Sequence, residues 1–402
     1  MNKSEKKIKI IGVGMDGDKT ITSEAKHAIE EVDLLIGAER ILRYFDYLEK
    51  PSVKSYDSRE IVRHIDECEC EKIAVLVSGD CGFYSAAGLL APLLNDYGTE
   101  LICGISTPVY LCSKLGLSWS DMRFVSLHGV DAPVVRSVCA NRYTFFLLGG
   151  KVTPSKICNK LCEYGRGEVN LYIGENLASP NEKILYGKAY EFREYESSRL
   201  CALIVENDNY ERHVPSCIAD GEFNRGKVPM TKSEVRGICV AKLEINDSDI
   251  CWDIGCGTGS VSIEMAFRCP KGRVISIDKN EEAISLTERN MKKFGCDNIE
   301  LLSGCAEELL QAVPAPNCVF IGGSGGSAEK IITAAIQKNP YAKIIVTAVS
   351  LETLNSCMEI FSKLNSEIEI SQIAVTHTRK IGSHTMLDSE NPIFIISRKT
   401  DG

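Results

Sequence analysis

The chain has 402 residues, of which 44% are hydrophobic and 25% are charged, and its net charge is −9. This length is too great for one ordinary hydrophobic core and favours two domains of about 200 residues each. The acidic balance argues against a nucleic-acid-binding protein, which needs a basic surface to meet phosphates. The sequence shows neither an apolar leader nor about 18 consecutive apolar residues, so we expect a cytoplasmic protein without a membrane contact.

The cysteines are numerous, 18 in all, but they are scattered singly through apparent strands and helices. Small apolar side chains behave in this way, and thiols stay reduced in the cytoplasm. The close pairs Cys68-Glu-Cys70 and Cys158-x3-Cys162 lack the Cys-x2-Cys spacing of a zinc site. We therefore expect free thiols and no bound metal.

Short apolar runs alternate with amphipathic stretches along almost the whole chain, a pattern typical of parallel strands joined by helices in an α/β fold. In the first half, helices are predicted at 23–31 and 58–68. Strands are predicted at 8–13, 33–37, 73–78, 99–103, 123–126, 144–148, 168–173 and 202–206.

A polar stretch at 208–227, with Gly221 and Gly226 and no periodicity, predicts a division into domains 1–208 and 209–402. Directly after it, Thr231-Lys-Ser-Glu234 predicts a capping box that begins a helix ending near Leu243. Further helices are predicted at 259–267, 281–294, 328–338 and 351–364. Strands are predicted at 250–254, 273–277, 299–302, 318–321, 343–347, 367–375 and 392–398.

The motif Asp253-Ile-Gly-Cys-Gly-Thr-Gly259 stands between a predicted strand and a predicted helix. Its glycines allow a sharp turn and let a ligand lie against the backbone. A dinucleotide fingerprint needs a glycine where this chain has Ser260, so a pyrophosphate site is the weaker interpretation. S-adenosylmethionine has no phosphate, and its amino-acid end can meet loop amides and an acidic side chain at the strand tip.

Two further features support a nucleoside site. Asp278 ends the second strand of this half, where a carboxylate can accept both ribose hydroxyls. Gly304-Cys-Ala-Glu-Glu308 follows the third strand, where such folds usually hold the edge of the adenine ring. These features together indicate an S-adenosylmethionine site.

With Pro229-Met-Thr-Lys-Ser-Glu-Val-Arg236 and Phe320-Ile-Gly-Gly-Ser-Gly-Gly326, these motifs resemble the precorrin C15-methyltransferases of cobalamin biosynthesis over nearly all of 215–402. The resemblance implies a Rossmann-like class I methyltransferase fold with a mainly parallel seven-stranded sheet. It implies methylation of C15 of a corrin precursor and removal of the carboxyl group of the C12 acetate. The family usually has Asp where this chain has Cys305, so the resemblance does not imply that this residue makes the family's hydrogen bond to adenine.

The same resemblance assigns residues. The implied cofactor contacts are Thr231, Gly255, Cys256, Gly257, Thr258, Gly259, Asp278 and Ala306. The loop implied to face the tetrapyrrole consists of Gly322, Gly323, Ser324, Gly325 and Gly326.

The N-terminal half carries four further motifs in order: Gly12-Val-Gly-Met-Asp-Gly-Asp18, Ser78-Gly-Asp-Cys-Gly-Phe-Tyr84, Gly104-Ile-Ser-Thr107 and Gly174-Glu-Asn-Leu177. With the strand at 33–37, they resemble the tetrapyrrole methylases, and among these the precorrin C5-methyltransferases, across 7–206. The resemblance implies two α/β lobes with S-adenosylmethionine between them. The implied contacts are Gly12, Gly14, Gly79, Asp80, Ser106 and Thr107. An alternative role for Asp80 is to cap a helix that begins at Tyr84.

A sulfonium methyl group is already activated, so positioning of the acceptor carbon can carry the reaction, and we assign no catalytic side chain. The carboxylates of a tetrapyrrole need cationic partners, for which the candidates are Lys232, Arg236, Arg379 and Lys380. Solvated surface charge is the alternative role for each of them. We expect Arg379 to lie in a loop between His377 and His384.

These observations favour a fused enzyme with two methylation sites, which we expect to form a homo-oligomer. A methyltransferase acting on RNA or protein is an alternative, because the Asp253 motif is shared across that class. Asn391-Pro-Ile-Phe394 faintly resembles an amino-methylating motif, but it opens the last strand rather than closing the fourth. In a third interpretation the N-terminal half only binds tetrapyrrole or holds the oligomer. That interpretation predicts one bound cofactor per chain, whereas the fused enzyme predicts two.

Overall fold

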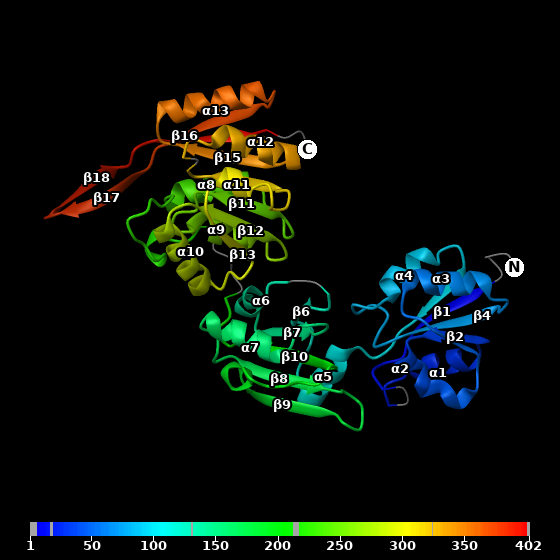
Figure 1. Ribbon diagram of the computed structural model, residues 1–402. Coiled ribbons are helices and arrows are strands. Elements are labelled where there is room, and N and C mark those ends of the chain that lie inside the picture. Colours follow the sequence, from blue (N-terminus) through cyan, green and yellow to red (C-terminus); the bar gives the residue numbers. More distant parts are fainter. Residues whose placement is uncertain (1–5, 17–18, 130–131, 212–216, 324, 400–402) are drawn as a thin grey trace. The chain divides into compact units, whose positions relative to one another are not determined.

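A computed structural model describes residues 6–16, 19–129, 132–211, 217–323 and 325–399 (Figure 1). Internal contacts divide the chain into two units, which we describe separately. Unit 1 comprises Met1–Val130, Arg142–Cys158 and Glu168–Glu206, and unit 2 comprises Asp131–Asn141, Asn159–Gly167 and Asn207–Gly402. The division after residue 208 stays a prediction, because two short segments of the N-terminal half group with unit 2. No helix in the described ranges has both the length and the apolar character needed to cross a membrane.

The first sheet of unit 1 is entirely parallel and has the order β3-β2-β4-β1-β5. Its strands are β1 (Lys7–Gly12), β2 (Leu34–Gly37), β3 (Ser52–Lys54), β4 (Lys72–Val77) and β5 (Gly98–Ile102). The flanking helices are α1 (Ser23–Glu30), α2 (Glu39–Leu42), α3 (Ser58–Glu67) and α4 (Ala87–Leu93). Ile8 and Ile10 pack with α3 and α4, whereas Ile11 packs with α1 and α2. Because both faces are covered, the strands are continuous apolar runs.

The second sheet of unit 1 is mixed and has the order β6-β7-β10-β8-β9. Its strands are β6 (Arg123–Ser126), β7 (Tyr143–Leu147), β8 (Asn170–Glu175), β9 (Lys183–Lys188) and β10 (Cys201–Glu206). Only β6 and β7 pair in parallel; the other neighbours are antiparallel. Helices α5 (Thr107–Leu115) and α7 (Pro154–Glu163) follow β5 and β7 in the sequence. The sequence did not predict β3, β9, α2, α5 or α7, and the helix considered from Tyr84 begins in the structure as α4 at Ala87.

Unit 2 contains the expected mainly parallel seven-stranded sheet, in the order β13-β12-β11-β14-β15-β19-β16. The parallel strands are β11 (Ile250–Ile254), β12 (Arg273–Asp278), β13 (Ile299–Ser303), β14 (Cys318–Ile321) and β15 (Lys343–Ala348). The strand β19 (Ile393–Arg398) runs antiparallel to both β15 and β16 (Ile368–Ile373). This architecture confirms the predicted fold class.

Helices cover both faces of this sheet. One core contains buried residues of α8 (Ser233–Lys242), α9 (Ser260–Arg268) and α10 (Glu281–Phe294), and the other contains those of α12 (Ala328–Lys338) and α13 (Leu351–Lys363). The short α11 (Ala306–Leu309) follows β13. Trp252, the largest fully buried side chain, belongs to the second core. The strand tips between these layers are therefore held rigidly.

The predicted capping box at Thr231 is wrong. Lys232 is the N-cap of α8, its backbone is extended with ψ 153°, and no side chain caps the helix. The carboxylate of Glu234 instead accepts a hydrogen bond from the Ser233 hydroxyl at 2.8 Å. The chain thus stays extended one residue longer than the pattern suggested.

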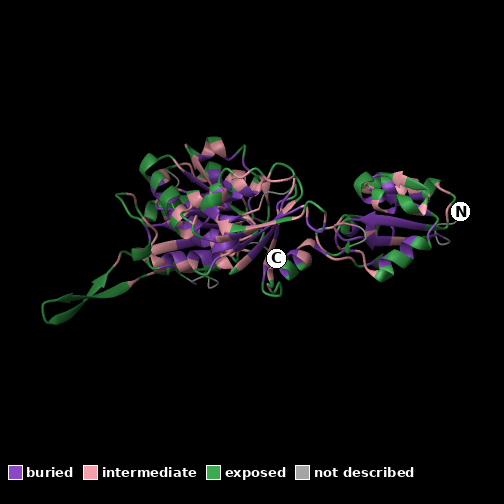
Figure 2. Cartoon of the chain, turned by 90° about the horizontal axis from the view of Figure 1, so that it is seen from below, coloured by how far each residue is buried: buried purple, intermediate pink, exposed green. Residues whose placement is uncertain are grey.

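The predicted loop around Arg379 is also wrong, because this segment is an antiparallel hairpin of β17 (Thr376–Ile381) and β18 (His384–Ser389). Every residue of both strands is exposed, as Figure 2 shows in green. Arg379 Nε lies 3.6 Å from Asp388 Oδ2 on the opposite strand.

Unit 2 also includes α6 (Val135–Ala140), whose N-terminus meets Asp297 in the turn before β13. The Asp297 carboxylate has no exposed surface and accepts the amides of Val134, Val135 and Arg136 at 2.7–3.0 Å. Lys160 Nζ lies 2.9 Å from the same carboxylate. A buried acid is thus fully neutralised by a helix N-terminus and a cation.

Candidate cofactor sites

The carboxyl ends of β11 to β14 in unit 2 enclose a pocket of 130 Å³. Its lining contains five of the predicted site residues: Gly255, Asp278, Ala306, Gly323 and Gly325. Cys305 and Glu307 also line it, and the Glu307 carboxylate accepts a hydrogen bond from Ser327 at 2.7 Å. Ligands bind at this edge of open parallel sheets, where neighbouring strands connect to opposite faces.

Two glycines show why this motif is glycine-rich. Gly255 has a φ of 75°, and a Cβ atom there would lie 2.5 Å from the carbonyl oxygen of Gly323. Gly257 has a φ of 57°, and a Cβ atom there would lie 2.6 Å from the carbonyl oxygen of Pro229. A side chain at either position would push these loops apart and change the shape of the pocket.

Asp278 is held in place by the backbone before any ligand binds. Its Oδ2 accepts the amide of Gly257 at 3.0 Å, and its Oδ1 accepts the amide of Asn280 at 2.9 Å. An ionised carboxylate has about four acceptor positions, so two remain for ribose hydroxyls. Asp278 therefore has the position and the free lone pairs for the predicted role.

Asp253, the acidic side chain at the strand tip, is fully buried. Its Oδ2 accepts the Ser262 hydroxyl, whereas its Oδ1 has no hydrogen-bond partner among the described residues. Desolvation by burial raises the pKa of the Asp253 carboxyl to about 7. The hydroxyl of Thr258 is buried without a described partner as well. Buried polar atoms are rarely left unpaired, so these two atoms fit the polar amino-acid end of S-adenosylmethionine.

None of the other predicted contacts in unit 2 that the structure describes lines this pocket. Gly259 is the N-cap of α9, and the buried Cys256 thiol lies 3.5 Å from Thr287 Oγ1. The Thr231 carbonyl accepts a hydrogen bond from Arg236. Gly322 and Gly326 border the lining residues in sequence, and Ser324 lies outside the described residues.

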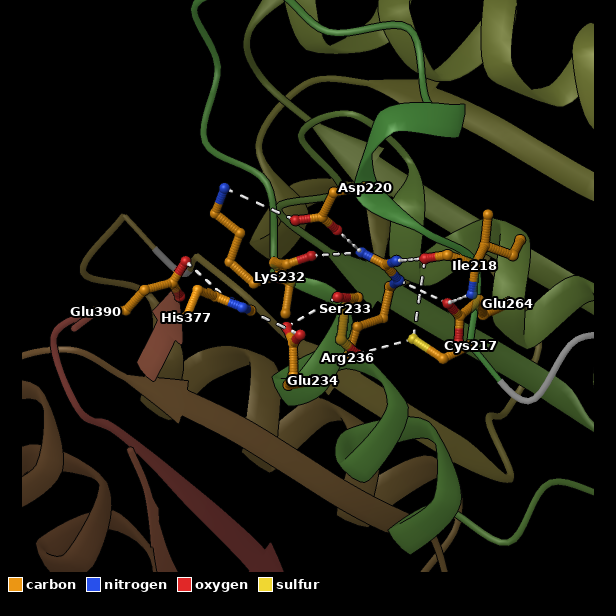
Figure 3. A network of polar contacts seen from close by, with 11 residues as sticks. Cys217, Ile218, Asp220, Lys232, Ser233, Glu234, Arg236, Glu264, His377 and Glu390 are labelled. Atoms are coloured by element: carbon orange, nitrogen blue, oxygen red, sulfur yellow. Dashed lines mark hydrogen bonds and ion pairs between the residues drawn. The ribbon is translucent and has the colours of Figure 1, made fainter. Parts of the chain in front are cut away.

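Arg236 is not available to a substrate, which corrects its predicted role (Figure 3). Its side chain has no exposed surface, and its Nε lies 2.6 Å from Glu264 Oε1. Its Nη1 donates to Asp220 Oδ1 at 3.1 Å and to the Thr231 carbonyl at 2.6 Å. Its Nη2 donates to the Ile218 carbonyl. The guanidinium thus ties the segment before α8 to α9.

Two of the other predicted substrate contacts are also in ion pairs, although both remain partly exposed. Lys232 Nζ lies 3.7 Å from Asp220 Oδ2, with 34% of its side chain exposed, and Arg379 pairs across the hairpin. His377, at the base of that hairpin, lies 3.7 Å from Glu234 and 4.0 Å from Glu390 (Figure 3). Neither cation lines the pocket, so their roles stay predictions.

The pocket of unit 1 is larger, with a volume of 420 Å³, and four of the six predicted contacts line it. These are Gly79, Asp80, Ser106 and Thr107, which follow β4 and β5. Gly174, Asn176 and Leu177, of the fourth motif, line it from the end of β8. The motifs that lie far apart in the sequence therefore meet around one cavity.

Gly12 and Gly14 support this pocket from behind. Gly14 and Gly79 exchange two backbone hydrogen bonds, of 3.0 Å and 2.7 Å. A Cβ atom on Gly12 would lie 2.8 Å from the carbonyl oxygen of Gly79. The close packing of these loops thus requires glycine.

Asp80 bonds to two loop amides, those of Gly82 at 2.8 Å and Gly104 at 3.1 Å. Helix α4 begins only at Ala87, with Ala86 as its N-cap and no side-chain cap. The alternative that Asp80 caps a helix beginning at Tyr84 is therefore wrong.

Other residues at the unit 1 pocket were missed in the sequence. Tyr84 lies within a motif and could have been found there, but Arg40, His128, Arg199 and Leu200 belong to no motif. Tyr84 and Asn176 have positive φ angles of 45° and 47°, which are uncommon for residues other than glycine and cluster at functional sites.

Two family models match this chain. The model of the tetrapyrrole (corrin/porphyrin) methylases matches residues 7–193, and that of the precorrin methyltransferase domain matches residues 222–399.

The curated relatives agree with this division. A probable cobalt-precorrin-6B C(15)-methyltransferase (decarboxylating) of Pyrobaculum calidifontis is 39% identical over 183 residues, covering 45% of this chain and 94% of the relative. A precorrin-6Y C(5,15)-methyltransferase (decarboxylating) of Sinorhizobium is 26% identical over 384 residues, covering 94% of this chain and 92% of the relative. Among solved structures, a precorrin-6y C5,15-methyltransferase of Geobacter metallireducens is 36% identical, with a TM-score of 0.44, and covers 46% of this chain and 96% of its own.

These matches confirm the predicted methyltransferase class, with S-adenosylmethionine as the methyl donor. The chain therefore belongs to the precorrin methyltransferases and joins a tetrapyrrole methylase domain to a precorrin methyltransferase domain.

Proposed function

We propose that this chain methylates both C5 and C15 of a precorrin or cobalt-precorrin and removes the carboxyl group of its C12 acetate. The observation that carries the proposal is the presence of two separate pockets, each at the carboxyl ends of parallel strands and each surrounded by a family's glycine motifs. The relative that spans both halves under a C(5,15)-methyltransferase name supports two activities in one chain.

In unit 2, the residues around the pocket bind and orient the cofactor. S-adenosylmethionine, when bound, supplies an activated methyl group. Asp278 accepts the ribose hydroxyls, and the unpaired Oδ1 of Asp253 accepts an ammonium proton from the amino-acid end. The close approach of Gly255 to Gly323 fixes the shape of the loops around the strand tips. Alignment of the acceptor carbon then contributes most of the acceleration.

The substrate supplies the remaining chemistry. C5 and C15 are bridge carbons of an enamine-like conjugated system, so each can form a carbon–carbon bond with the transferred methyl as the sulfur–methyl bond breaks and S-adenosylhomocysteine leaves. Bond formation at C15 leaves an iminium cation nearby. The electron pair of the bond to the acetate carboxylate moves into that cation, and carbon dioxide leaves. The reaction needs no nucleophilic side chain.

The proposal also covers the cellular location of the enzyme, its oligomeric state and its partners. We propose that it works in the cytoplasm as a homo-oligomer and does not bind nucleic acid. The net charge of −9 supports the last point. The fully exposed β17–β18 hairpin supports self-association, because an isolated two-stranded hairpin is at best marginally stable in water.

The test is incubation of the full chain with precorrin-6B or cobalt-precorrin-6B and labelled S-adenosylmethionine, followed by mass spectrometry. We expect a gain of two methyl groups and a loss of one carbon dioxide on one of the two substrates. No mass change on either would refute the proposal. A gain of one methyl would indicate that one unit only binds. Methylation of RNA or protein by the same preparation would favour the alternative class.

A further inference from the structure

We infer that Arg40 and Arg199 bind carboxylates of the tetrapyrrole at the mouth of the unit 1 pocket, and this inference rests on the proposed function. Both residues line that pocket, and neither belongs to a motif of the methylase family.

Arg40 lies on α2 and has one polar contact, a hydrogen bond from its Nη2 to Ser78 Oγ at 3.3 Å. The neighbouring acid, Glu39, is already engaged, because Arg43 and Lys54 both lie 3.0 Å from its Oε1. In the described ranges Arg40 forms no ion pair, and most of its donors are free.

Arg199 lies on a turn whose backbone is fixed. The Ser198 amide donates to Glu175 Oε1 at 2.8 Å, and the Asn176 amide donates to the Leu200 carbonyl at 2.9 Å. Glu175 is buried, and its carboxylate also accepts a hydrogen bond from Tyr195. The Arg199 guanidinium itself has no hydrogen bond or ion pair to any residue that the structure describes.

The charge of the pocket lining is therefore positive in an acidic protein. Asp80 is the one carboxylate among the lining residues, and both of its oxygens accept loop amides. Two guanidiniums without counter-charges remain. Each can bind a carboxylate through two parallel hydrogen bonds, which a lysine cannot do.

The surface beside these arginines is apolar. Tyr84 and Leu200 line the same pocket with 54% and 52% of their surface exposed. A tetrapyrrole has a flat conjugated ring with carboxylates along its rim, so it matches an apolar surface flanked by cations. The volume of 420 Å³ lies at the small end of ligand pockets, which span about 300–1,000 Å³. A cofactor can fill the interior, which leaves the ring at the mouth.

The competing ligand is the carboxylate of the cofactor itself, and the experiment separates the two. The double variant Arg40→Gln/Arg199→Gln is compared with the wild-type chain in two titrations, one with uroporphyrin as a stable polycarboxylate probe and one with S-adenosylhomocysteine. Arg43→Gln is the matched control, because Arg43 lies next to α2, pairs with Glu39 and does not line the pocket. Circular dichroism checks that each variant is folded.

We expect uroporphyrin to bind the double variant at least about tenfold more weakly at one class of site, since each charged hydrogen bond contributes about 1.5–3 kcal/mol. Binding of S-adenosylhomocysteine should not change. The variant Arg40→Lys/Arg199→Lys keeps both charges but loses the planar guanidinium groups. Its affinity for uroporphyrin should therefore lie between those of the wild-type chain and the glutamine double variant. In turnover, KM for the C5 substrate should rise while kcat stays within about twofold.

Either of two results would overturn the inference. The first is an unchanged affinity of the double variant for uroporphyrin. The second is a loss of affinity that affects S-adenosylhomocysteine and not uroporphyrin. The proposed function fails in a different way. If the wild-type chain methylates no precorrin but the uroporphyrin effect is present, the carboxylate site stands and the assigned reaction does not.

Discussion

The two proposed cofactor sites differ in which charged groups have no partner among the described residues. In unit 2 the acids are available: Asp278 keeps free lone pairs, and Asp253 Oδ1 is buried without a described partner. In unit 1, Asp80 accepts one loop amide on each oxygen, as Asp278 does, and the charges without an ion pair in the described ranges are those of Arg40 and Arg199. An unpaired buried acid thus distinguishes the site in unit 2, and two unpaired cations distinguish the pocket in unit 1.

The largest effect is expected for Arg236→Met, which tests whether unit 2 depends on the ionic network beneath α8. Removing Arg236 takes away the nearest cation of the buried Glu264, which keeps Arg268 at 3.8 Å, and leaves the partly exposed Asp220 with Lys232 at 3.7 Å. We expect the free energy of unfolding of unit 2 to fall by about 3–5 kcal/mol. Urea denaturation measures this, and Arg379→Gln, in an exposed pair, should cost less than about 1 kcal/mol. An equal, small loss in both variants would contradict the assigned structural role.

The second prediction tests whether the acids differ in role. Asp278→Ala should lower the rate of C15 methylation and decarboxylation by about 100-fold or more, since two charged hydrogen bonds to the ribose are lost. C5 methylation should continue. Asp80→Asn is the matched change in unit 1, and it should affect C5 methylation alone. Mass spectrometry of the products separates the two positions. Loss of both methylations from either variant would mean that the sites are not independent.

The third prediction concerns how the stability of the chain and its affinity for the cofactor depend on pH. The ordinary pKa of an aspartic acid is 3.8, and burial raises that of Asp253 to about 7. The folded chain without ligand therefore holds this proton more tightly than the unfolded chain. The resulting stabilisation is complete below about pH 4 and is lost as the pH rises through about 7. An ammonium group binds the ionised form, so cofactor affinity at unit 2 should fall about tenfold for each pH unit below 7.

Calorimetry with S-adenosylhomocysteine between pH 5 and pH 8 measures this dependence. Asp253→Asn should bind the ligand weakly at all pH values and show a flat profile. The unit 1 site, which has no such acid, should titrate little over the same range. A wild-type profile as flat as that of the variant would show that Asp253 does not meet the ammonium.

The smallest effect is expected at Cys305, which is exposed and lines the unit 2 pocket. Cys305→Asp restores the acceptor usual in the resembled family, so affinity for S-adenosylhomocysteine should rise by about two- to tenfold. Cys305→Ala is the control and should change it by less than about twofold. No gain in the aspartate variant would place the adenine edge away from this residue.

Much of the fold could be predicted, because buried parallel strands are continuous apolar runs and many helix ends carry local signals. The helix α10 was predicted at its observed bounds, with Asn280 as N-cap and Gly295 at its C-terminus. The hairpin β17–β18 was missed because all of its residues are exposed, so its sequence lacks the alternation of a half-buried strand.

The candidate sites were predictable only where a motif fixes the backbone. Glycines such as Gly255 and Gly79 indicate a loop at the end of a strand. The acids near these loops could therefore be predicted as site residues. The role of Arg236 depends on Glu264, 28 residues further on, and no local pattern records that contact. Arg40 and Arg199 come together through tertiary structure alone, so they give no signal in the sequence.

The contact between Asp297 and α6 has a practical consequence for dissecting the protein. A fragment that begins at residue 209 contains Asp297 but lacks Val134, Val135, Arg136 and Lys160, which neutralise it. The carboxylate would then be uncovered at the turn leading into β13, whose far end borders the Asp278 pocket. The turn before β13 in the C-terminal half of this chain thus depends on residues from the N-terminal half.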